Sequence, residues 1–391
     1  MSKIRDSLIV KLLLAVIIGV VLGLVVNERI IGIIITAKYI LGQFIFYCVP
    51  LIIIGFITPS ITSLKSNASK MLGTALIIAY LSSVGAALFS MVAGYIIIPG
   101  LNIATNPEGL KTLPELIFQL DIPPIMSVMS ALVFSIVVGL AIIWTQSKTI
   151  ERLFEEFHNI MMSVVTRMVI PVLPIFIATT FAGLAYEGSI TKQFPVFIEV
   201  IIIVLIGHFI WLAILYSIGG LISKENPIEV VKHYGPAYLT AVGTMSSAAT
   251  LPVALNCARQ SKVLDKEVVD FAIPIGATIH LCGSVLTETF FVMTISKILY
   301  GALPPLSSMI TFIILLGIFA IGAPGVPGGT VMASLGLITG ILGFDESGVA
   351  LMLTIFALQD SFGTACNITG DGAIALMLTG IFKNKKEKEP V

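Results

Sequence analysis

Long apolar stretches alternate with short polar or charged segments along almost the whole chain. Each apolar stretch holds about 20 residues or more, the length that a helix needs to cross a bilayer. The pattern predicts eight membrane-spanning helices, over residues 8–26, 30–61, 71–98, 125–145, 160–185, 194–222, 271–299 and 349–378. Pro171 and Pro174 predict a bend in the fifth span. We therefore expect an all-α, polytopic membrane protein.

Two further apolar segments are interrupted by small and polar residues. Residues 235–258 are apolar at both ends but Gly-, Ser- and Thr-rich over Gly243–Thr250, and basic residues follow. Residues 306–342 carry GAPGVPGGT at Gly322–Thr330, which cannot form regular helix. Each segment is predicted to be a re-entrant hairpin, and the two enter from opposite sides. Inverted repeats with broken helices are typical of secondary transporters.

Polar residues of the last span recur every three or four positions. Residues at this spacing share one face of a helix; they are Asp360, Gly363, Thr364, Asn367 and Asp371. Carboxylates at membrane depth are costly and usually mark a pathway for substrate or ions. The alternative is that both carboxylates lie in a water-exposed helix end.

The seventh span has a polar centre of its own. It contains His280, Cys282 and Glu288. His280 and Cys282 are two residues apart, so they are expected to point to different sides of a helix. A membrane-embedded enzyme would need a nucleophile–base or metal cluster, so this spacing argues against an enzyme.

Composition narrows the classes of function. The 391 residues are 57% hydrophobic and 11% charged, and the mean hydropathy is +1.05. A soluble domain cannot bury so much apolar surface. The zero net charge gives no basis for nucleic-acid binding. The four cysteines have no paired spacing, so neither disulfides nor a zinc site is expected. We find no signal-peptide cleavage site and no ATP-binding P-loop, and expect no cofactor.

Basic residues predict the orientation. If every span crosses once, they fall on one side of the membrane, which the positive-inside rule assigns to the cytoplasm. They are Lys3, Arg5, Lys11, Lys65, Lys70, Lys148, Arg152, Lys224, Lys232, Lys383, Lys385, Lys386 and Lys388. Both termini are therefore predicted to be cytoplasmic, in the cell's inner (plasma) membrane.

Three motifs together resemble the dicarboxylate/amino acid:cation symporter family, which contains the glutamate transporters. They are SSAATLP at 246–252, GAPGVPGG at 322–329, and the D-x3-T-x2-N-x3-D pattern that starts at Asp360. The chain looks closest to the bacterial serine/threonine symporters. The resemblance implies a homotrimer with an elevator mechanism. It also implies a scaffold of residues 1–70 and 99–190, a transport domain of residues 71–98 and 191–383, and a cytoplasmic tail of residues 384–391.

The resemblance also implies a substrate site. Its residues would be Ser246, Ser247 and Ala248 in the first tip, Gly325, Val326, Pro327 and Gly328 in the second, and Asp360, Gly363, Thr364 and Asn367 in the last span. Asp360 would bind the substrate ammonium, whereas the serines could instead serve helix packing. Gly363 replaces an arginine of the acidic amino acid transporters and leaves room. An acidic side chain would then be buried unpaired, so a small neutral amino acid is expected. The alternative is a dicarboxylate or acidic amino acid.

The coupling ion stays open between sodium and a proton. The family's N-M-D-G-T motif is here residues 280–284, HLCGS, and its aspartate is Cys282. One sodium site would remain, formed by Asn367, Asp371, Gly276 and Ser284. Glu288 and His280 would instead serve proton coupling. The plainer alternatives are a hydrogen-bonded core histidine, and a glutamate at the wet outer end of the span. An ion channel is disfavoured because the polar residues form no continuous pore.

Overall fold

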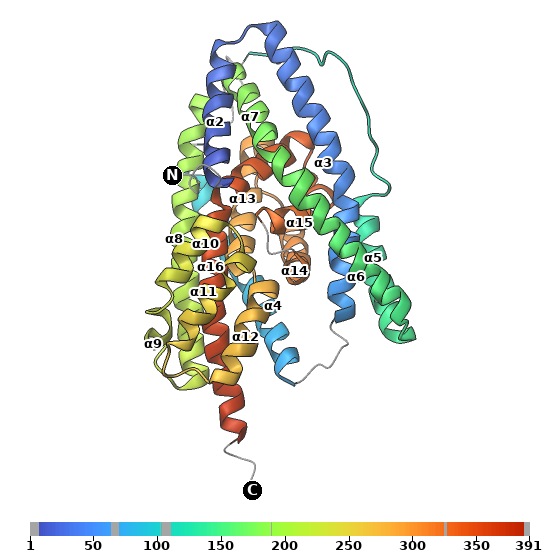
Figure 1. Cartoon of the computed structure of the whole chain (residues 1–391). Coiled ribbons are helices and arrows are strands. Elements are labelled where there is room, and N and C mark those ends of the chain that lie inside the picture. The colour runs from blue at the N-terminus through green and yellow to red at the C-terminus, as the bar shows by residue number, and fades with distance from the viewer. Residues whose placement is uncertain are drawn as a thin grey trace.

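The computed structural model describes residues 8–63, 70–101, 103, 111–188, 190–323 and 327–386. All regular secondary structure of this part of the chain is helical, as predicted (Figure 1). The helices are α2 (Leu8–Val25), α3 (Glu28–Ser63), α4 (Lys70–Ile97), η1 (Ile98–Gly100), α5 (Val128–Thr145), α6 (Lys148–Val164), η2 (Val165–Val169), α7 (Ile170–Glu187), α8 (Ile190–Ser223), α9 (Ile228–Val231), α10 (Gly235–Thr244), α11 (Ser247–Arg259), α12 (Lys266–Ile279), α13 (Cys282–Tyr300), α14 (Leu306–Gly322), α15 (Gly329–Gly340) and α16 (Glu346–Lys386).

Six apolar segments of the described structure are long enough to cross a membrane. They are Glu28–Pro59, Lys70–Gly100, Lys148–Glu187, Val196–Ser223, Lys266–Tyr300 and Ser347–Phe382. The first and fourth expected spans correspond to shorter apolar helices, Leu14–Val25 and Val133–Thr145. A total of eight spans therefore remains a prediction.

The fifth expected span begins earlier than the sequence pattern indicated. α6 and α7 are joined by the π-helical turn η2, so helical structure runs from Lys148 to Glu187. Pro171 lies at the start of α7 and Pro174 lies inside it. Proline has no N–H to complete the α-helical pattern. The π-helical turn η2 lies just before the two prolines, which agrees with the loss of their backbone N–H groups from the α-helical hydrogen bonds.

Both predicted hairpins are present as pairs of short helices. α10 and α11 are separated at Met245, which adopts a left-handed φ of 53°, and α14 and α15 at Gly328, with a φ of 72°. α9 and the C-terminal end of α16 lie toward the lower end of Figure 1. The first hairpin lies between α9 and α12 and opens toward that end. The second lies between α13 and α16 and opens toward the upper end, so the hairpins are inverted relative to each other.

The seventh expected span is broken, which the sequence analysis did not foresee. α12 ends at Ile279, His280 is extended with φ −111° and ψ 102°, and α13 begins at Cys282. The break therefore leaves helix-end N–H groups of α13 in the protein interior, where they need partners.

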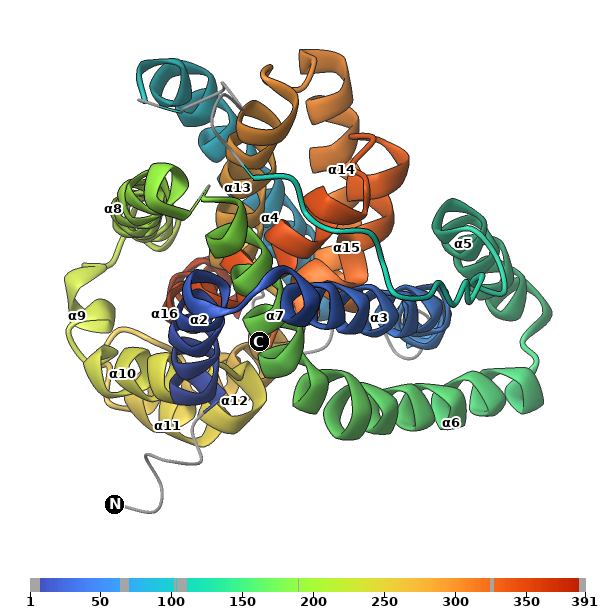
Figure 2. The ribbon, with the colours of Figure 1, turned by 90° about the horizontal axis from the view of Figure 1, so that it is seen from above.

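The helices pack as two groups around α16. α2, α3, α5, α6 and α7 contact mainly one another, whereas α16 packs against α8, α10, α12 and α13. Viewed from above, α5 and α6 lie on one side and α8 to α11 on the other (Figure 2). The second hairpin contacts both groups, through α3 and α5 on one side and α4 on the other. The division into scaffold and transport domain remains a prediction that this packing neither requires nor contradicts.

Candidate functional site

The polar face of the last span lies deep in the protein. Its residues belong to one unbroken helix, α16, and Asp360 and Asp371 are only 4% and 1% exposed. Thr364 and Asn367 are buried as well. The alternative that these carboxylates lie in a water-exposed helix end is therefore wrong.

Asp360 contacts the tip of the second hairpin. Its Oδ2 accepts a hydrogen bond of 2.6 Å from the backbone N–H of Gly328. Gly328 precedes the first residue of α15, so its N–H belongs to a helix N-terminus, where a negative charge is favoured. Pro327 is half-buried beside it. Gly325 and Val326, the other expected residues of this tip, lie outside the described residues.

The first hairpin tip places its serines at the start of α11. The side chain of Ser246 accepts a hydrogen bond from the N–H of Ala249 and so caps this helix. Ser247 is buried and Ala248 is exposed. α11 also packs against α16. A role for these three residues in substrate binding remains a prediction.

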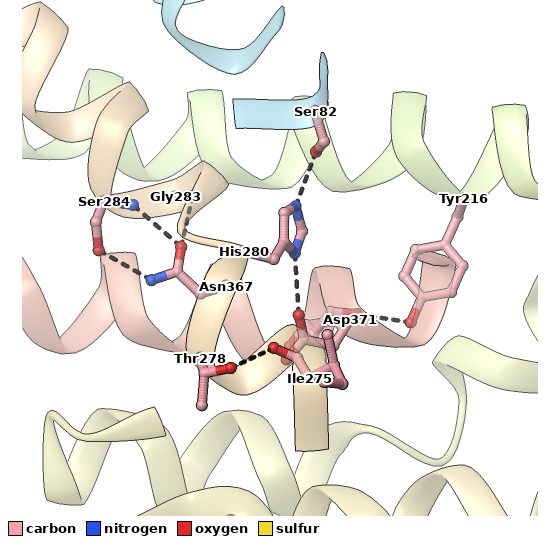
Figure 3. Close-up of polar contacts among 10 residues, drawn as sticks. Ser82, Tyr216, Ile275, Thr278, His280, Gly283, Ser284, Asn367 and Asp371 are labelled. Atoms are coloured by element: carbon pink, nitrogen blue, oxygen red, sulfur yellow. Dashed lines mark hydrogen bonds and ion pairs between the residues drawn. The ribbon is translucent and has the colours of Figure 1, made fainter. Parts of the chain in front are cut away.

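Asn367 is the hydrogen-bond partner of the backbone N–H groups that the helix break leaves at the start of α13 (Figure 3). Its Oδ1 accepts from the backbone N–H groups of Gly283 and Ser284, at 2.7 and 3.2 Å, and its Nδ2 donates to Ser284 Oγ at 2.9 Å. A Cβ on Gly363 would lie 3.3 Å from the Cα and Oγ of Ser284. The expectation that Gly363 leaves open space is therefore wrong, because Ser284 occupies the direction that a side chain would take.

His280 and Asp371 form the centre of the site. His280 Nδ1 lies 3.0 Å from Asp371 Oδ1, and its Nε2 lies 2.8 Å from Ser82 Oγ of α4 (Figure 3). A Cβ on Gly276 would lie 2.7 Å from Asp371 Oδ1, so α12 approaches α16 closely there. Asp371 Oδ2 has no hydrogen-bond partner among the described residues. The alternative of a hydrogen-bonded core histidine is correct in geometry, but the partner is a buried carboxylate.

The expected sodium ligands are brought together, but their oxygens are already engaged. Asn367 Oδ1 accepts two N–H groups, Ser284 Oγ accepts from Asn367, and Asp371 Oδ1 pairs with His280. Hard cations need several oxygen ligands at once. Asp371 Oδ2 is the side-chain oxygen of this set that has no hydrogen-bond partner among the described residues.

Glu288 lies apart from this cluster. It is fully buried, and the hydroxyl of Ser334 on α15 donates to its Oε1. The alternative that Glu288 sits at the wet end of its span is therefore wrong. Its Oε2 has no partner among the described residues. Glu288 thus joins the broken helix to the second hairpin.

His280 and Cys282 face the same helix, which corrects the argument from spacing. A Cβ on Gly370 of α16 would lie 2.8 Å from His280 Cε1 and 3.2 Å from Cys282 Sγ. The two-residue rule assumed a continuous helix, and the extended backbone at His280 removes that assumption. All four cysteines are buried free thiols. In the described part of the chain, no three His, Cys, Asp or Glu side chains gather into a metal site.

Three polar residues beside the site had no predicted role in it. Tyr216 donates to the carbonyl of Thr369 at 2.8 Å, and Ser334 holds Glu288. His208 lies 3.1 Å from the carbonyl of Gly283 and 2.9 Å from Thr287 Oγ1. Each is a polar residue in an otherwise apolar helix, and this feature of the sequence could have identified it as a candidate site residue.

The inverted hairpins, the broken helix and the buried polar groups between them define a class of protein. Irregular backbone at membrane depth is found where it lines a binding site, and inverted pairs of this kind build secondary transporters. The family model described as "Sodium:dicarboxylate symporter family" matches residues 8–381. The chain belongs to this family, and it is a multi-pass membrane protein. The family is one of transporters rather than enzymes, which agrees with the expectation from sequence.

Individual relatives are distant. Excitatory amino acid transporter 2 of Mus musculus is 28% identical over 228 residues, which cover 56% of this chain and 39% of that protein. Excitatory amino acid transporter 3 of Bos taurus is 28% identical over 269 residues, 68% of this chain and 50% of that protein. Neutral amino acid transporter B(0) of Rattus norvegicus is 28% identical over 250 residues, 63% and 44% respectively. The chain spans about half the length of the curated relatives it matches. They include both substrate types, so the serine/threonine branch remains a prediction.

Proposed function

We propose that this chain is a cation-coupled symporter of a small neutral amino acid. The main support is the set of charged side chains in the protein interior. Asp360 is buried, whereas no Lys or Arg side chain is buried among the described residues. Asp360 can pair with a substrate ammonium, which would replace the N–H of Gly328 as its partner. The N–H groups at the hairpin tips suit the substrate carboxylate. An acidic side chain would find no cation, and a buried unpaired charge costs several kcal/mol, on the order of 3–5.

We also propose that the coupling cation is a proton carried at His280. His280 Nδ1 lies 3.0 Å from Asp371 Oδ1, where a ring N–H can donate to the carboxylate, and the hydroxyl of Ser82 can either donate to Nε2 or accept from it. Both protonation states of the imidazole therefore keep two hydrogen bonds. Cys282 Sγ lies beside the His280 ring at Gly370, and Asp371 is the carboxylate in direct contact with that ring. Glu288 is the second candidate carrier, at the second hairpin.

Uptake into proteoliposomes tests both proposals. Labelled serine, alanine and threonine would be offered with an inward proton gradient alone, and separately with an inward sodium gradient alone. We expect accumulation with the proton gradient when choline replaces sodium, and no competition by excess glutamate or succinate. Micromolar competition by glutamate would instead favour the alternative, a dicarboxylate or acidic amino acid symporter. Accumulation that follows only the sodium gradient would contradict proton coupling.

The homotrimer, the elevator movement and the cytoplasmic termini are proposed from family resemblance. The lower end of Figure 1, where α16 ends, also holds the C-terminal end of α3 and the start of α4. This agrees with one common side for the basic segments that follow α3 and α16, whereas α2, which carries Lys11, is drawn in the upper half. Native mass of the purified protein and protease access to a C-terminal tag in oriented vesicles test the trimer and the orientation. A monomeric mass, or a tag cut only from outside, would contradict them.

A further inference from the structure

Two buried thiols lie together beside the helix break. Cys282 is the first residue of α13, Cys366 lies on α16, and both are 0% exposed. The side chain of Cys282 interacts directly with that of Cys366. Cys366 Sγ also lies 3.9 Å from the carbonyl of His208, as the donor of a weak hydrogen bond that leaves the sulfur lone pairs unused. The proposed transport function gives neither thiol a role.

Each thiol packs against a glycine of the other helix. A Cβ on Gly283 of α13 would lie 3.0 Å from Cys366 Sγ, and a Cβ on Gly370 of α16 would lie 3.2 Å from Cys282 Sγ. Because neither glycine carries a side chain, the two helices approach closely at this level. The two sulfurs therefore lie in the same layer of the contact between α13 and α16.

A pair of thiols selects a class of ion. Sulfur ligands favour soft ions such as copper(I), whereas sodium, magnesium and calcium prefer oxygen. A structural zinc ion needs about four ligands, and no cluster of three or more His, Cys, Asp or Glu side chains suited to a metal is found among the described residues. Monovalent copper and silver are satisfied by two sulfurs. In the exchange R–SH + Ag⁺ → R–S–Ag + H⁺, with the second thiol as a neutral ligand and the proton released to solvent, the buried charge is unchanged and no unpaired charge results.

We propose that Cys282 and Cys366 form a two-coordinate site for a monovalent soft metal ion of the copper(I) and silver(I) class, and that a bound ion stops transport. The ion would join the first residue of α13 to the residue that precedes Asn367. Asn367 Oδ1 accepts the N–H groups of Gly283 and Ser284, so this link lies at the contact that stabilises the helix break. A metal held by both sulfurs fixes the start of α13 against α16. The effect on transport rests on the proposed function, whereas binding of the ion does not.

The probe is silver(I) nitrate in chloride-free buffer, added to the purified full-length protein. Bound silver would be measured by mass spectrometry of the metal after gel filtration with excess N-acetylcysteine, a monothiol that removes silver from single cysteines. We expect one silver ion per chain. Cys366→Ala should bind silver about 10²-fold more weakly or worse, because the second thiol acts at a high effective concentration. The double variant Cys48→Ala/Cys257→Ala, which removes the other two buried cysteines, is the matched control and should retain silver.

A second variant and a second readout make the outcome decisive. Cys282→Ala replaces Cys366→Ala if that protein unfolds, and thermal unfolding checks each variant. Equal silver retention by a folded single variant and the control, or no retention by the unsubstituted protein, would overturn the site.

Uptake into proteoliposomes tests the link to transport. Silver should abolish serine uptake by the double-variant control and leave that of the folded single variant at its own silver-free rate. Equal inhibition of both would overturn the effect on transport. A protein that retains silver at this pair but takes up no serine would contradict the proposed substrate and not the metal site.

Discussion

The two carboxylates of α16 are buried alike but have different hydrogen-bond partners. They lie three helical turns apart, roughly 16 Å at 1.5 Å per residue. Asp360 accepts a backbone N–H from a hairpin tip, whereas Asp371 pairs with a side chain, His280, at the break between α12 and α13. A backbone N–H is a weak partner that an ammonium can replace. An imidazole can gain or lose a proton without leaving. The comparison supports the proposal that Asp360 binds the substrate ammonium and that the His280–Asp371 pair serves coupling.

Removing the charge of Asp360 should have the largest effect. In Asp360→Asn the substrate ammonium loses its buried counter-ion, which costs about 3–5 kcal/mol and corresponds to about 10²–10⁴-fold weaker serine uptake at low concentration. Initial rates in proteoliposomes measure it. Asp270→Asn, which removes an exposed carboxylate of the Arg259 ion pair, is the matched control and should keep normal uptake. Normal uptake by Asp360→Asn would contradict the proposal that Asp360 binds the substrate ammonium.

Neutral replacement of His280 should separate coupling from binding. His280→Gln keeps a hydrogen-bonding side chain but cannot carry a proton, so accumulation driven by a pH gradient should fall about tenfold or more. Exchange of internal for external serine should fall much less, because it needs no net proton transfer. His233→Gln, on the turn before α10, serves as control. If His280→Gln still accumulates serine with a proton gradient, Glu288 becomes the carrier.

The sequence predicted which residues of α16 share the polar face, but not all of the residues that pack against that face. The spacing of Asp360, Asn367 and Asp371 defined their shared face, because the helix period fixes it. Small residues and prolines located both hairpin tips. Family resemblance brought Gly276 and Ser284 to Asn367 and Asp371, but the residues alone could not show that Ser82 contacts His280, 198 positions away. A single sequence contains no information about which distant segments meet.

The helix break at His280 was missed for a physical reason. His280 and Leu281 are ordinary helix residues, and neither glycine nor proline stands at that point. The break is stabilised by tertiary structure, since Asn367 accepts the N–H groups that the break leaves at Gly283 and Ser284. Local propensity is a weak determinant and tertiary contacts routinely override it. The same contact explains why Gly363 faces Ser284 and not an open space.

A methyl group at Gly276 should disturb the Asp371 end and spare the Asp360 end. The added Cβ would lie 2.7 Å from Asp371 Oδ1 and 2.8 Å from its Cγ, so the carboxylate must move. Overpacking of this kind costs about 1–3 kcal/mol of stability, and we expect a several-fold loss of pH-driven uptake. Gly73→Ala is the control, because its Cβ would meet nothing within 4 Å. Thermal unfolding and uptake with varied gradients measure the two effects, and an unchanged Gly276→Ala would contradict the close packing.

The smallest effect should come from Ser334, which holds Glu288. Ser334→Ala removes the hydroxyl that donates to Glu288 Oε1 and leaves a buried carboxyl with one partner fewer. One hydrogen bond is worth about 1 kcal/mol, so uptake should change about fivefold. Ser307→Ala, an exposed serine of the same hairpin, is the matched control. If His280 is the proton carrier, Ser334→Ala should alter the rate and leave the dependence on the pH gradient intact. A lost dependence would move the coupling site from the α16 cluster to the second hairpin.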